Sequence, residues 1–226
     1  MAKSGVSNKE MTKFNLKITN NSADYLLLFK PEESTLKANG KEYKPKEKWL
    51  EVPPTETEHK VVNFEGSDFF IPSYTYEMDG LYKVSVTNQA ITTPDFQLPA
   101  SVNEFKTGNF TCTIVDYKKE TDKTTAKFDC HYTGDKIGIV NPGNAAMKLP
   151  DGTEIANAKT IKAPIVLMKG ESKKITLTWN RVEEGKNTDM QKIKLFIVRR
   201  NTFVESNAVK IKPATLEFKI DEAKSK

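Results

Sequence analysis

Apolar and polar residues alternate with a period of two in several stretches of this sequence. Phe14, Leu16 and Ile18 are separated by polar neighbours, and so are Ile175 and Leu177. This alternation is typical of a strand that buries one face. The chain also contains 11 prolines, and proline interrupts long helices because it lacks a backbone N–H. The pattern therefore predicts an all-β fold.

Two short turn motifs support this prediction. Asn39-Gly40 and Asp151-Gly152 each lie between strand-like arms. A two-residue hairpin turn needs positive φ angles at its centre, which Asn, Asp and Gly tolerate best. We expect a hairpin at both places.

The two halves of the chain resemble each other. The segment "FKPEESTLKANGKEY" (29–43) matches "VNPGNAAMKLPDGTEI" (140–155) in the order of its turn and strand residues. Similar landmarks recurring in one order predict a tandem duplication with small loop insertions. The matched pairs are Pro31 with Pro142, Gly40 with Gly152, Phe64 with Trp179, and residues 81–86 with 193–198.

Each half supplies about seven short strands, the number expected of an immunoglobulin-like sandwich. The predicted fold is two tandem immunoglobulin-like β-sandwich domains, with prolines marking the join between them. The expected division is a flexible N-terminus (1–11), a first sandwich (12–93), a linker (94–104), a second sandwich (105–204), additional strands (205–220) and a flexible C-terminus (221–226). The additional strands are expected to cover a sheet edge that would otherwise promote aggregation.

Three stretches resemble the immunoglobulin-like sandwich modules of bacterial extracytoplasmic proteins, many of which have no known function. These stretches are "ITNNSADYLLL", "LKANGKEYKP" followed by "VPPTETEHKVV", and "MKLPDGTEIANA" followed by "LMKGESKKITLTW". The resemblance implies a sandwich fold and an extracytoplasmic setting, and it implies no catalytic site. The Cys…Trp…Cys arrangement of antibody domains is missing.

Charge and composition exclude some functions. The chain has 35 Lys+Arg against 30 Asp+Glu, a net charge of +5, but these charges are interspersed along the sequence. A nucleic-acid binder gathers its basic residues on one face, so no nucleic-acid partner is expected. No apolar run reaches the roughly 18 residues of a membrane span, and "MAKSGVSNKEMTK" has no apolar core of a signal peptide. The protein is therefore expected to be extracytoplasmic if a signal peptide was removed, and cytoplasmic or part of a virion otherwise.

Both cysteines lie in one predicted hairpin, "FTCTIVDYKKETDKTTAKFDCHYTG" (110–134). Centring the hairpin on Thr121 pairs Cys112 with Cys130 and matches the apolar faces of both arms. Opposed residues of this kind lie within reach of a disulfide. The pair is a disulfide or two reduced core thiols, and metal or redox use is the third alternative. His131 alternates to the opposite face, which disfavours a zinc site, since zinc needs four ligands.

No catalytic residues, cofactor site or metal site are predicted. With only His59 and His131 available, a Ser or Cys nucleophile has few possible bases, and no nucleophile-elbow motif occurs. Phosphate-cradling and dinucleotide-binding glycine motifs are missing as well. His59 is expected to face solvent from a strand.

Two places are candidates for partner binding. The segment 63–82 is rich in aromatic residues, and Phe69, Phe70, Tyr74 and Tyr76 could bind a sugar or anchor a protein. Strand alternation would instead bury about half of these rings in the core.

The second candidate is the pair Arg199 and Arg200, whose side chains point to opposite faces of a strand. At least one should be exposed and able to bind a carboxylate of a partner. A surface ion pair within the chain is the alternative.

These observations predict a non-enzymatic binding or assembly protein of the bacterial cell envelope or surface, which presents sandwich loops or edges to a protein partner. A carbohydrate-binding module that uses the aromatics of 63–82, or a phage or viral structural protein, is the alternative. The partner and the oligomeric state do not follow from the sequence.

Overall fold

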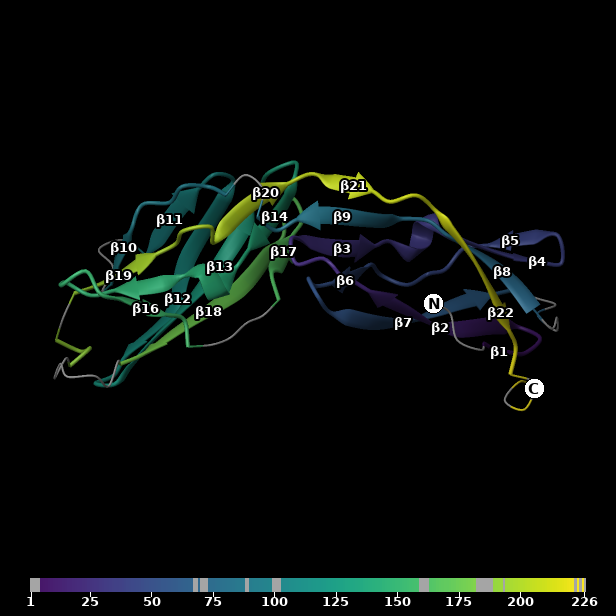
Figure 1. Cartoon of the computed structure of the whole chain (residues 1–226), viewed down its shortest axis with the longest axis horizontal. Coiled ribbons are helices and arrows are strands. Elements are labelled where there is room, and N and C mark those ends of the chain that lie inside the picture. The colour runs from purple at the N-terminus through teal and green to yellow at the C-terminus, as the bar shows by residue number, and fades with distance from the viewer. Residues whose placement is uncertain are drawn as a thin grey trace. The chain divides into compact units, whose positions relative to one another are not determined.

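The chain is all-β, as predicted. The computed structural model describes residues 5–66, 69, 73–87, 90–98, 103–158, 163–181, 189–192, 194–221, 223 and 225. Antiparallel strands dominate these residues, and the helices η1 and η2 are 3-10 turns of three residues each (Figure 1).

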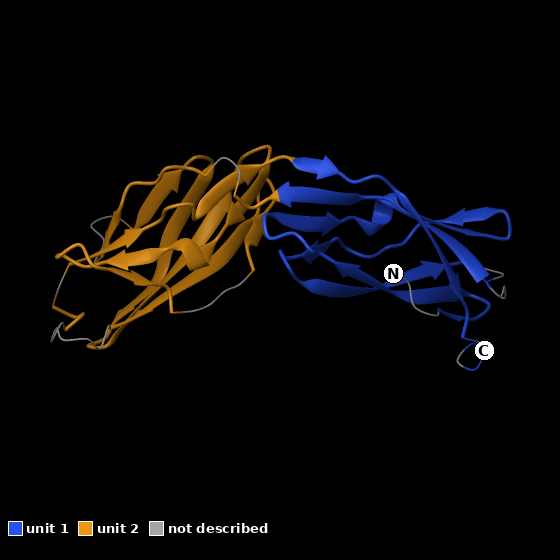
Figure 2. Cartoon of the chain, in the orientation of Figure 1, with its two compact units in different colours: residues 1–84, 208–226 blue, residues 85–207 orange. Residues whose placement is uncertain are grey.

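The chain forms two compact units (Figure 2). Unit 1 comprises Met1–Val84 together with Ala208–Lys226, and unit 2 comprises Ser85–Asn207. The predicted domain boundaries differ from this division. Residues 94–104, expected to be a linker, contain a strand of unit 2, and residues 205–220 contain two strands of unit 1. The linker was expected because of its prolines, yet Phe96 and Leu98 carry enough apolar surface to join the core of unit 2.

Unit 1 contains three sheets, with the strand orders β1-β2-β7, β21-β9-β3-β6 and β22-β8-β4-β5. Its elements are β1 (Val6–Ser7), β2 (Met11–Thr19), β3 (Tyr25–Phe29), η1 (Pro31–Glu33), β4 (Thr35–Ala38), β5 (Lys41–Tyr43), β6 (Leu50–Val52), β7 (Thr57–Glu65), β8 (Ser73–Met78), β9 (Leu81–Ser85), β21 (Ala208–Lys210) and β22 (Ala214–Lys219).

Unit 2 also contains three sheets, with the orders β11-β12-β13-β18, β17-β14-β20 and β10-β19-β15-β16. Its elements are β10 (Phe96–Leu98), β11 (Glu104–Thr107), β12 (Phe110–Lys119), β13 (Lys123–Tyr132), β14 (Ile137–Val140), η2 (Pro142–Asn144), β15 (Ala146–Lys148), β16 (Glu154–Ala156), β17 (Ile165–Leu167), β18 (Ser172–Asn180), β19 (Leu195–Val198) and β20 (Phe203–Ser206).

The predicted alternation builds both cores. Phe14, Leu16 and Ile18 of β2 are buried, and so are Ile175 and Leu177 of β18. Each unit has a sandwich-like core into which the buried faces of its strands point. The period-two pattern therefore predicted correctly which of these side chains are buried.

The two units share local features at the positions matched in the sequence. In both, a buried strand leads into a 3-10 turn that begins with proline, at Pro31 in η1 and at Pro142 in η2. Phe64 and Trp179 lie one residue before the ends of β7 and β18, and neither is exposed to solvent.

One predicted match is wrong. Residues 81–85 form β9, which pairs with β3 and β21, whereas β19 pairs with β15 and β10. By its pairing, β9 corresponds to β20, and β19 corresponds to β8. Short apolar strands have similar sequences, so the pattern of one strand did not identify its counterpart.

One of the two predicted hairpins has the expected turn. Asn39 and Gly40 have φ angles of 51° and 71°, and they join β4 to β5. The arms around Asp151-Gly152 are joined by a longer loop, because the pairing of β15 with β16 ends at Lys148 and Glu154. Pro150 lies in this loop, where its lack of an N–H costs no ladder hydrogen bond.

Candidate functional site

The strand β22 completes a sheet of unit 1 although all of unit 2 separates it from the other strands along the chain. It lies beside β8 at a sheet edge, and its pairs run from Ala214 opposite Met78 to Lys219 opposite Ser73 (Figure 1). Just before it, β21 pairs with β9, with Ala208 opposite Val84. We call residues 208–219 the first-unit segment. It is the candidate functional site because here a sheet edge accepts a strand from a distant part of the chain.

Phe218 anchors this segment in the core of unit 1. Its ring is 4% exposed, and its centroid lies 4.3 Å from that of Phe14 and 5.3 Å from that of Tyr74. Gly5 leaves room for the ring, because a Cβ at that position would lie 2.8 Å from Phe218. The backbone of Gly5 also bonds to this end of the strand, since its N–H donates to the carbonyl of Lys219. Burying a phenylalanine side chain contributes about 2–3 kcal/mol.

A polar cluster holds the other end of the segment. Lys210 Nζ lies 2.9 Å from a carboxylate oxygen of Glu33 and 3.0 Å from Asp79, while Tyr82 donates its hydroxyl hydrogen bond to Glu33 at 2.8 Å. We call Glu33, Asp79, Tyr82 and Lys210 the Lys210 cluster. It connects β21 to η1 and to the turn between β8 and β9.

The charges of this cluster shift one another's pKa. Burial raises the pKa of Glu33, but the hydrogen bonds from Lys210 and Tyr82 outweigh that effect and leave it below its ordinary value. The hydrogen bond from Lys210 lowers the pKa of Asp79, with help from the backbone N–H of Gly80. The hydrogen bonds to Glu33 and Asp79 raise the pKa of Lys210. Glu33, Asp79 and Lys210 are therefore charged at neutral pH, while the hydrogen bond to Glu33 raises the pKa of Tyr82 and keeps it neutral. Exposure to solvent screens the attraction between the charges.

Unit 2 has a segment in the corresponding position. Residues 90–98, which we call the second-unit segment, first form a bridge between Ala90 and Val204 of β20. They then continue as β10 along β19, with Leu98 opposite Leu195. The first-unit segment likewise runs along β9 and then along β8, and all of these pairings are antiparallel. The two segments thus occupy matching positions in their units and run in the same sense.

Their sequences match as well. The second-unit segment is "AITTPDFQL", and the first-unit segment begins "AVKIKPATLEF". Each starts with Ala and a β-branched residue, contains a proline, and has near its end two apolar residues separated by one polar residue. Leu216 lies opposite Tyr76, and Phe96 lies opposite Ile197 at the corresponding place.

Arg199 fastens the second-unit segment. Its guanidinium group donates to the carbonyl of Pro94 and lies 3.7 Å from the ring centroid of Phe105, while its own carbonyl accepts a hydrogen bond from Thr93. The residue is 3% exposed, and its Nε and Nη1 have no hydrogen-bond partner among the described residues. Burial lowers the pKa of Arg199 to about 10, against a raising effect of Asp95. Arg199 was predicted to be a partner-binding residue, but it is a buried residue that stacks on an aromatic ring, so this prediction is wrong.

Arg200 is exposed, as expected of one member of the pair. Its Nη1 and Nη2 donate to the two carboxylate oxygens of Glu154 at 2.6 and 2.8 Å. This arrangement is the surface ion pair that was the alternative to partner binding.

The aromatic residues of 63–82 do not form an exposed surface where the structure describes them. Phe69 and Tyr76 are fully buried, and Tyr74 is 2% exposed. The hydroxyl of Tyr74 donates to the carbonyl of Phe69 and lies 2.9 Å from the hydroxyl of Ser7. The prediction that these three rings bind a partner is wrong, because strand alternation in β8 turns Tyr74 and Tyr76 into the core and Phe69, outside the strands, packs 4.7 Å from the ring of Tyr43. Phe70 lies outside the described residues.

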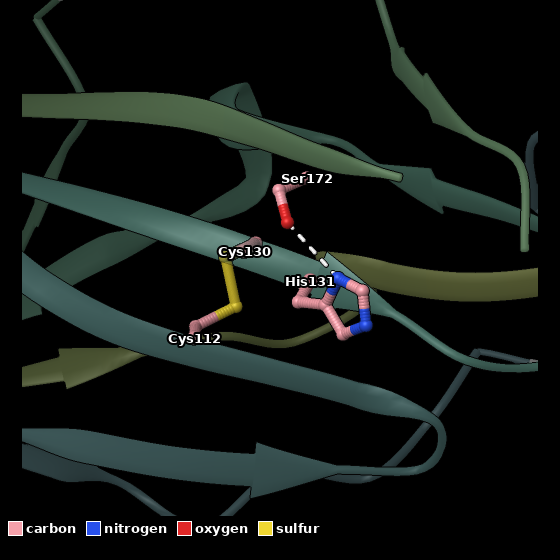
Figure 3. The surroundings of a disulfide bond; sticks show 4 residues. All are labelled: Cys112, Cys130, His131 and Ser172. Carbon is pink, nitrogen blue, oxygen red and sulfur yellow. Dashed lines mark hydrogen bonds between the residues drawn. A yellow bond between two sulfur atoms is a disulfide. The ribbon is translucent and has the colours of Figure 1, made fainter. Parts of the chain in front are cut away.

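The predicted register of the cysteine hairpin is confirmed from Phe110 to Ile114, and beyond Ile114 it shifts by one residue, so that Asp116 lies opposite Lys127. Cys112 lies opposite Cys130 and Phe110 opposite Tyr132, and the two sulfurs form a disulfide (Figure 3). His131 lies on the other face, where its Nδ1 is 2.9 Å from the hydroxyl of Ser172. Within the described residues, no three His, Cys, Asp or Glu side chains gather in a way that could hold a metal ion.

Sequence reasoning placed additional strands in 205–220 but missed which unit they complete. The recurrence of Ala, proline and a paired apolar ending in the two segments was the signal that could have revealed their equivalence. Each segment follows the last matched region of its half, residues 81–86 and 193–198.

No protein-family model and no curated protein matches the sequence. Among solved structures, red sea bream transglutaminase aligns with 98% of this chain at 9% identity, with a TM-score of 0.22. The aligned part is 31% of the transglutaminase chain. At this TM-score we base no inference about fold or activity on the alignment. In the part of the chain that the structure describes, no helix has the length and apolar character needed to span a membrane.

Proposed function

We propose that this chain is a non-enzymatic assembly or binding protein built of two tandem immunoglobulin-like sandwiches, which binds a protein partner by strand pairing at a sheet edge. One observation carries the proposal: the edge formed by β8 pairs with a strand that comes from beyond the whole of unit 2. An edge that accepts a strand from so far along the chain has the chemistry to accept an extended strand of another polypeptide.

Strand addition supplies both affinity and specificity. Each backbone hydrogen bond of the added strand contributes about 0.5–1.5 kcal/mol net. Alternate side chains enter pockets and select the sequence. At the β8 edge, the pocket filled by Phe218 is lined by the rings of Phe14 and Tyr74.

The setting that we propose is the bacterial cell envelope or surface. The Cys112–Cys130 disulfide supports this, because disulfides persist in oxidising compartments and are rare in the cytoplasm. The carbohydrate-binding alternative loses its support at Phe69, Tyr74 and Tyr76, because these rings are buried.

The proposal is tested with a peptide probe. A full-length chain carrying Thr75→Cys is mixed with a synthetic peptide of residues 208–220 that carries cysteine in place of Glu217, which lies opposite Thr75. The chain is used both with native Phe218 and with Phe218→Asp, which weakens the competing segment of the chain itself. We expect a mixed disulfide that is stronger in the Phe218→Asp chain.

A matched peptide controls for chance collision of thiols. It has the same cysteine but aspartate at the position of Phe218, and we expect it to give little product. Equal labelling by the two peptides, or no labelling of either chain, would contradict binding of a strand at this edge.

A further inference from the structure

The two segments are exchanged between the units with respect to the order of the chain. The second-unit segment follows β9 of unit 1 along the sequence, yet it completes unit 2. The first-unit segment follows β20 of unit 2, yet it completes unit 1. Each half of the chain therefore supplies its last strands to the other half.

This layout is that of two modules that swap strands. If each module is one copy of the duplicated sequence, then the strands after β9 and after β20 are the same element of the two copies, as their matching sequences and pairings indicate. The first copy donates the second-unit segment to unit 2, and the second copy donates the first-unit segment to unit 1. Domain swapping is the exchange of an identical element between two copies of a module.

Unit 1 holds the first-unit segment through its backbone pairs with β8 and β9 and through its side chains. The same pairs and side-chain contacts can form with an identical segment of another chain. We propose that the first-unit segment, residues 208–219, also exchanges between copies of this protein, so that the segment of one chain completes unit 1 of another. This inference rests on the proposed function and identifies the partner as a second copy of the chain.

The two arrangements have the same contacts. Residue pairs such as Phe218 with Tyr74 and Lys210 with Glu33 form equally well whether the segment is supplied from within the chain or from another one. The ratio of exchanged to unexchanged chains therefore depends on two quantities. One is the protein concentration relative to the effective concentration of the chain's own segment, and the other is the strain in the residues that connect unit 2 to this segment. Exchange should increase as the protein becomes more concentrated.

The test uses two full-length variants, one carrying Thr75→Cys and the other carrying Glu217→Cys and a tag that changes its mass. They are unfolded together without reductant, which keeps the Cys112–Cys130 disulfide, then refolded at several concentrations and mildly oxidised. The two positions are opposite each other in β8 and β22. Exchange predicts a disulfide-linked product of mixed mass whose yield rises with concentration.

The chain offers a matched control on the other side of Thr75. Lys37 of β4 is also opposite Thr75, and β4 belongs to the contiguous part of unit 1. A mixture of Lys37→Cys and Thr75→Cys chains should give no mixed product. A single chain carrying both Thr75→Cys and Glu217→Cys checks the register, and it should form the β8–β22 cross-link.

Three results would overturn the inference. The first is a mixed product in the Lys37 control as well, which would show general association. The second is no mixed product at any concentration while the doubly substituted chain closes on itself. The third is failure of the doubly substituted chain to cross-link at all. If the peptide labels Thr75→Cys but the chains do not exchange, strand binding remains the function and only the identity of the partner is wrong.

Discussion

Phe218 stacks on Tyr74 with the two ring planes 13° apart, and the two residues are directly opposite each other in β22 and β8. The core of unit 1 therefore includes the ring of Phe218, which comes from the C-terminal part of the chain, whereas most of unit 1 is formed by residues 1–84. The stability of unit 1 should depend on this distant residue, and the two tryptophans allow this to be measured. Trp49 lies in unit 1 and Trp179 in unit 2, so Trp179→Phe leaves a fluorescence reporter of unit 1 alone.

In that background, Phe218→Ala should lower the free energy of unfolding of unit 1 by about 3 kcal/mol, because it removes a buried ring and leaves a cavity. Urea unfolding followed by Trp49 fluorescence measures the change. Lys219→Ala, at the exposed neighbouring position, is the matched control and should change it by less than about 0.5 kcal/mol. Similar losses in the two variants would mean that Phe218 does not anchor the segment.

The Lys210 cluster should make unit 1 sensitive to acid. Glu33 and Asp79 have pKa values below their ordinary values of 4.5 and 3.8. A carboxylate with a depressed pKa in the folded state stabilises that state above its ordinary pKa, and this stabilisation is lost as the pH falls through the depressed value. We expect the free energy of unfolding of unit 1 to fall as the pH is lowered from about 5 towards 2.

The hydrogen bond from Lys210 is the largest of the effects that lower both pKa values, so Lys210→Met should flatten this part of the pH profile. Lys37→Met, which removes the ion pair with Glu77 in the same unit, is the control and should leave the contribution of Glu33 and Asp79 in place. High salt should reduce the effect, since the cluster is exposed. A profile that is the same with and without Lys210 would rule out this origin.

Arg199 should respond differently to two substitutions. Its buried guanidinium has two nitrogens without partners among the described residues, and such a charge is costly to keep out of water. Arg199→Met keeps most of the volume without the charge, so the stability of unit 2 should change by less than about 1 kcal/mol or increase. Arg199→Ala leaves a cavity beside Phe105 and should cost about 2–3 kcal/mol.

The measurement is urea unfolding of a Trp49→Phe background, in which Trp179 reports on unit 2. Equal and large losses for Met and Ala would show that the hydrogen bond to Pro94 outweighs the cost of burying the charge.

Local pattern predicted much of this fold. The alternation around Phe14 and Ile175 identified buried faces correctly, and matching the apolar faces of one hairpin gave the pairing of Cys112 with Cys130. These features depend on neighbours in sequence, where side-chain period and turn geometry decide the outcome.

The candidate site could not be predicted in the same way. The first-unit segment pairs with strands from which the whole of unit 2 separates it along the chain, and local sequence does not identify such distant partners. The alternation in "ATLEF" fits a sheet edge of either unit. The aromatic residues misled for a related reason. Composition marks Tyr74 and Tyr76 as possible binding residues, but only the direction of the strand determines that both are buried.

The disulfide gives the most direct test of the proposed setting. Protein from its native source, alkylated under denaturing conditions, should add label at Cys112 and Cys130 only after reduction, as read from the intact mass. The bond spans a sequence separation of 18, and closing a loop of this size stabilises a protein by about 3 kcal/mol in the chain-entropy model. Reduction should therefore shift the unfolding of unit 2, reported by Trp179, and leave that of unit 1 unchanged. Labelling of both thiols without reduction would count against an oxidising compartment, while the strand-exchange experiment would stand independently, because β8 and β22 belong to the other unit.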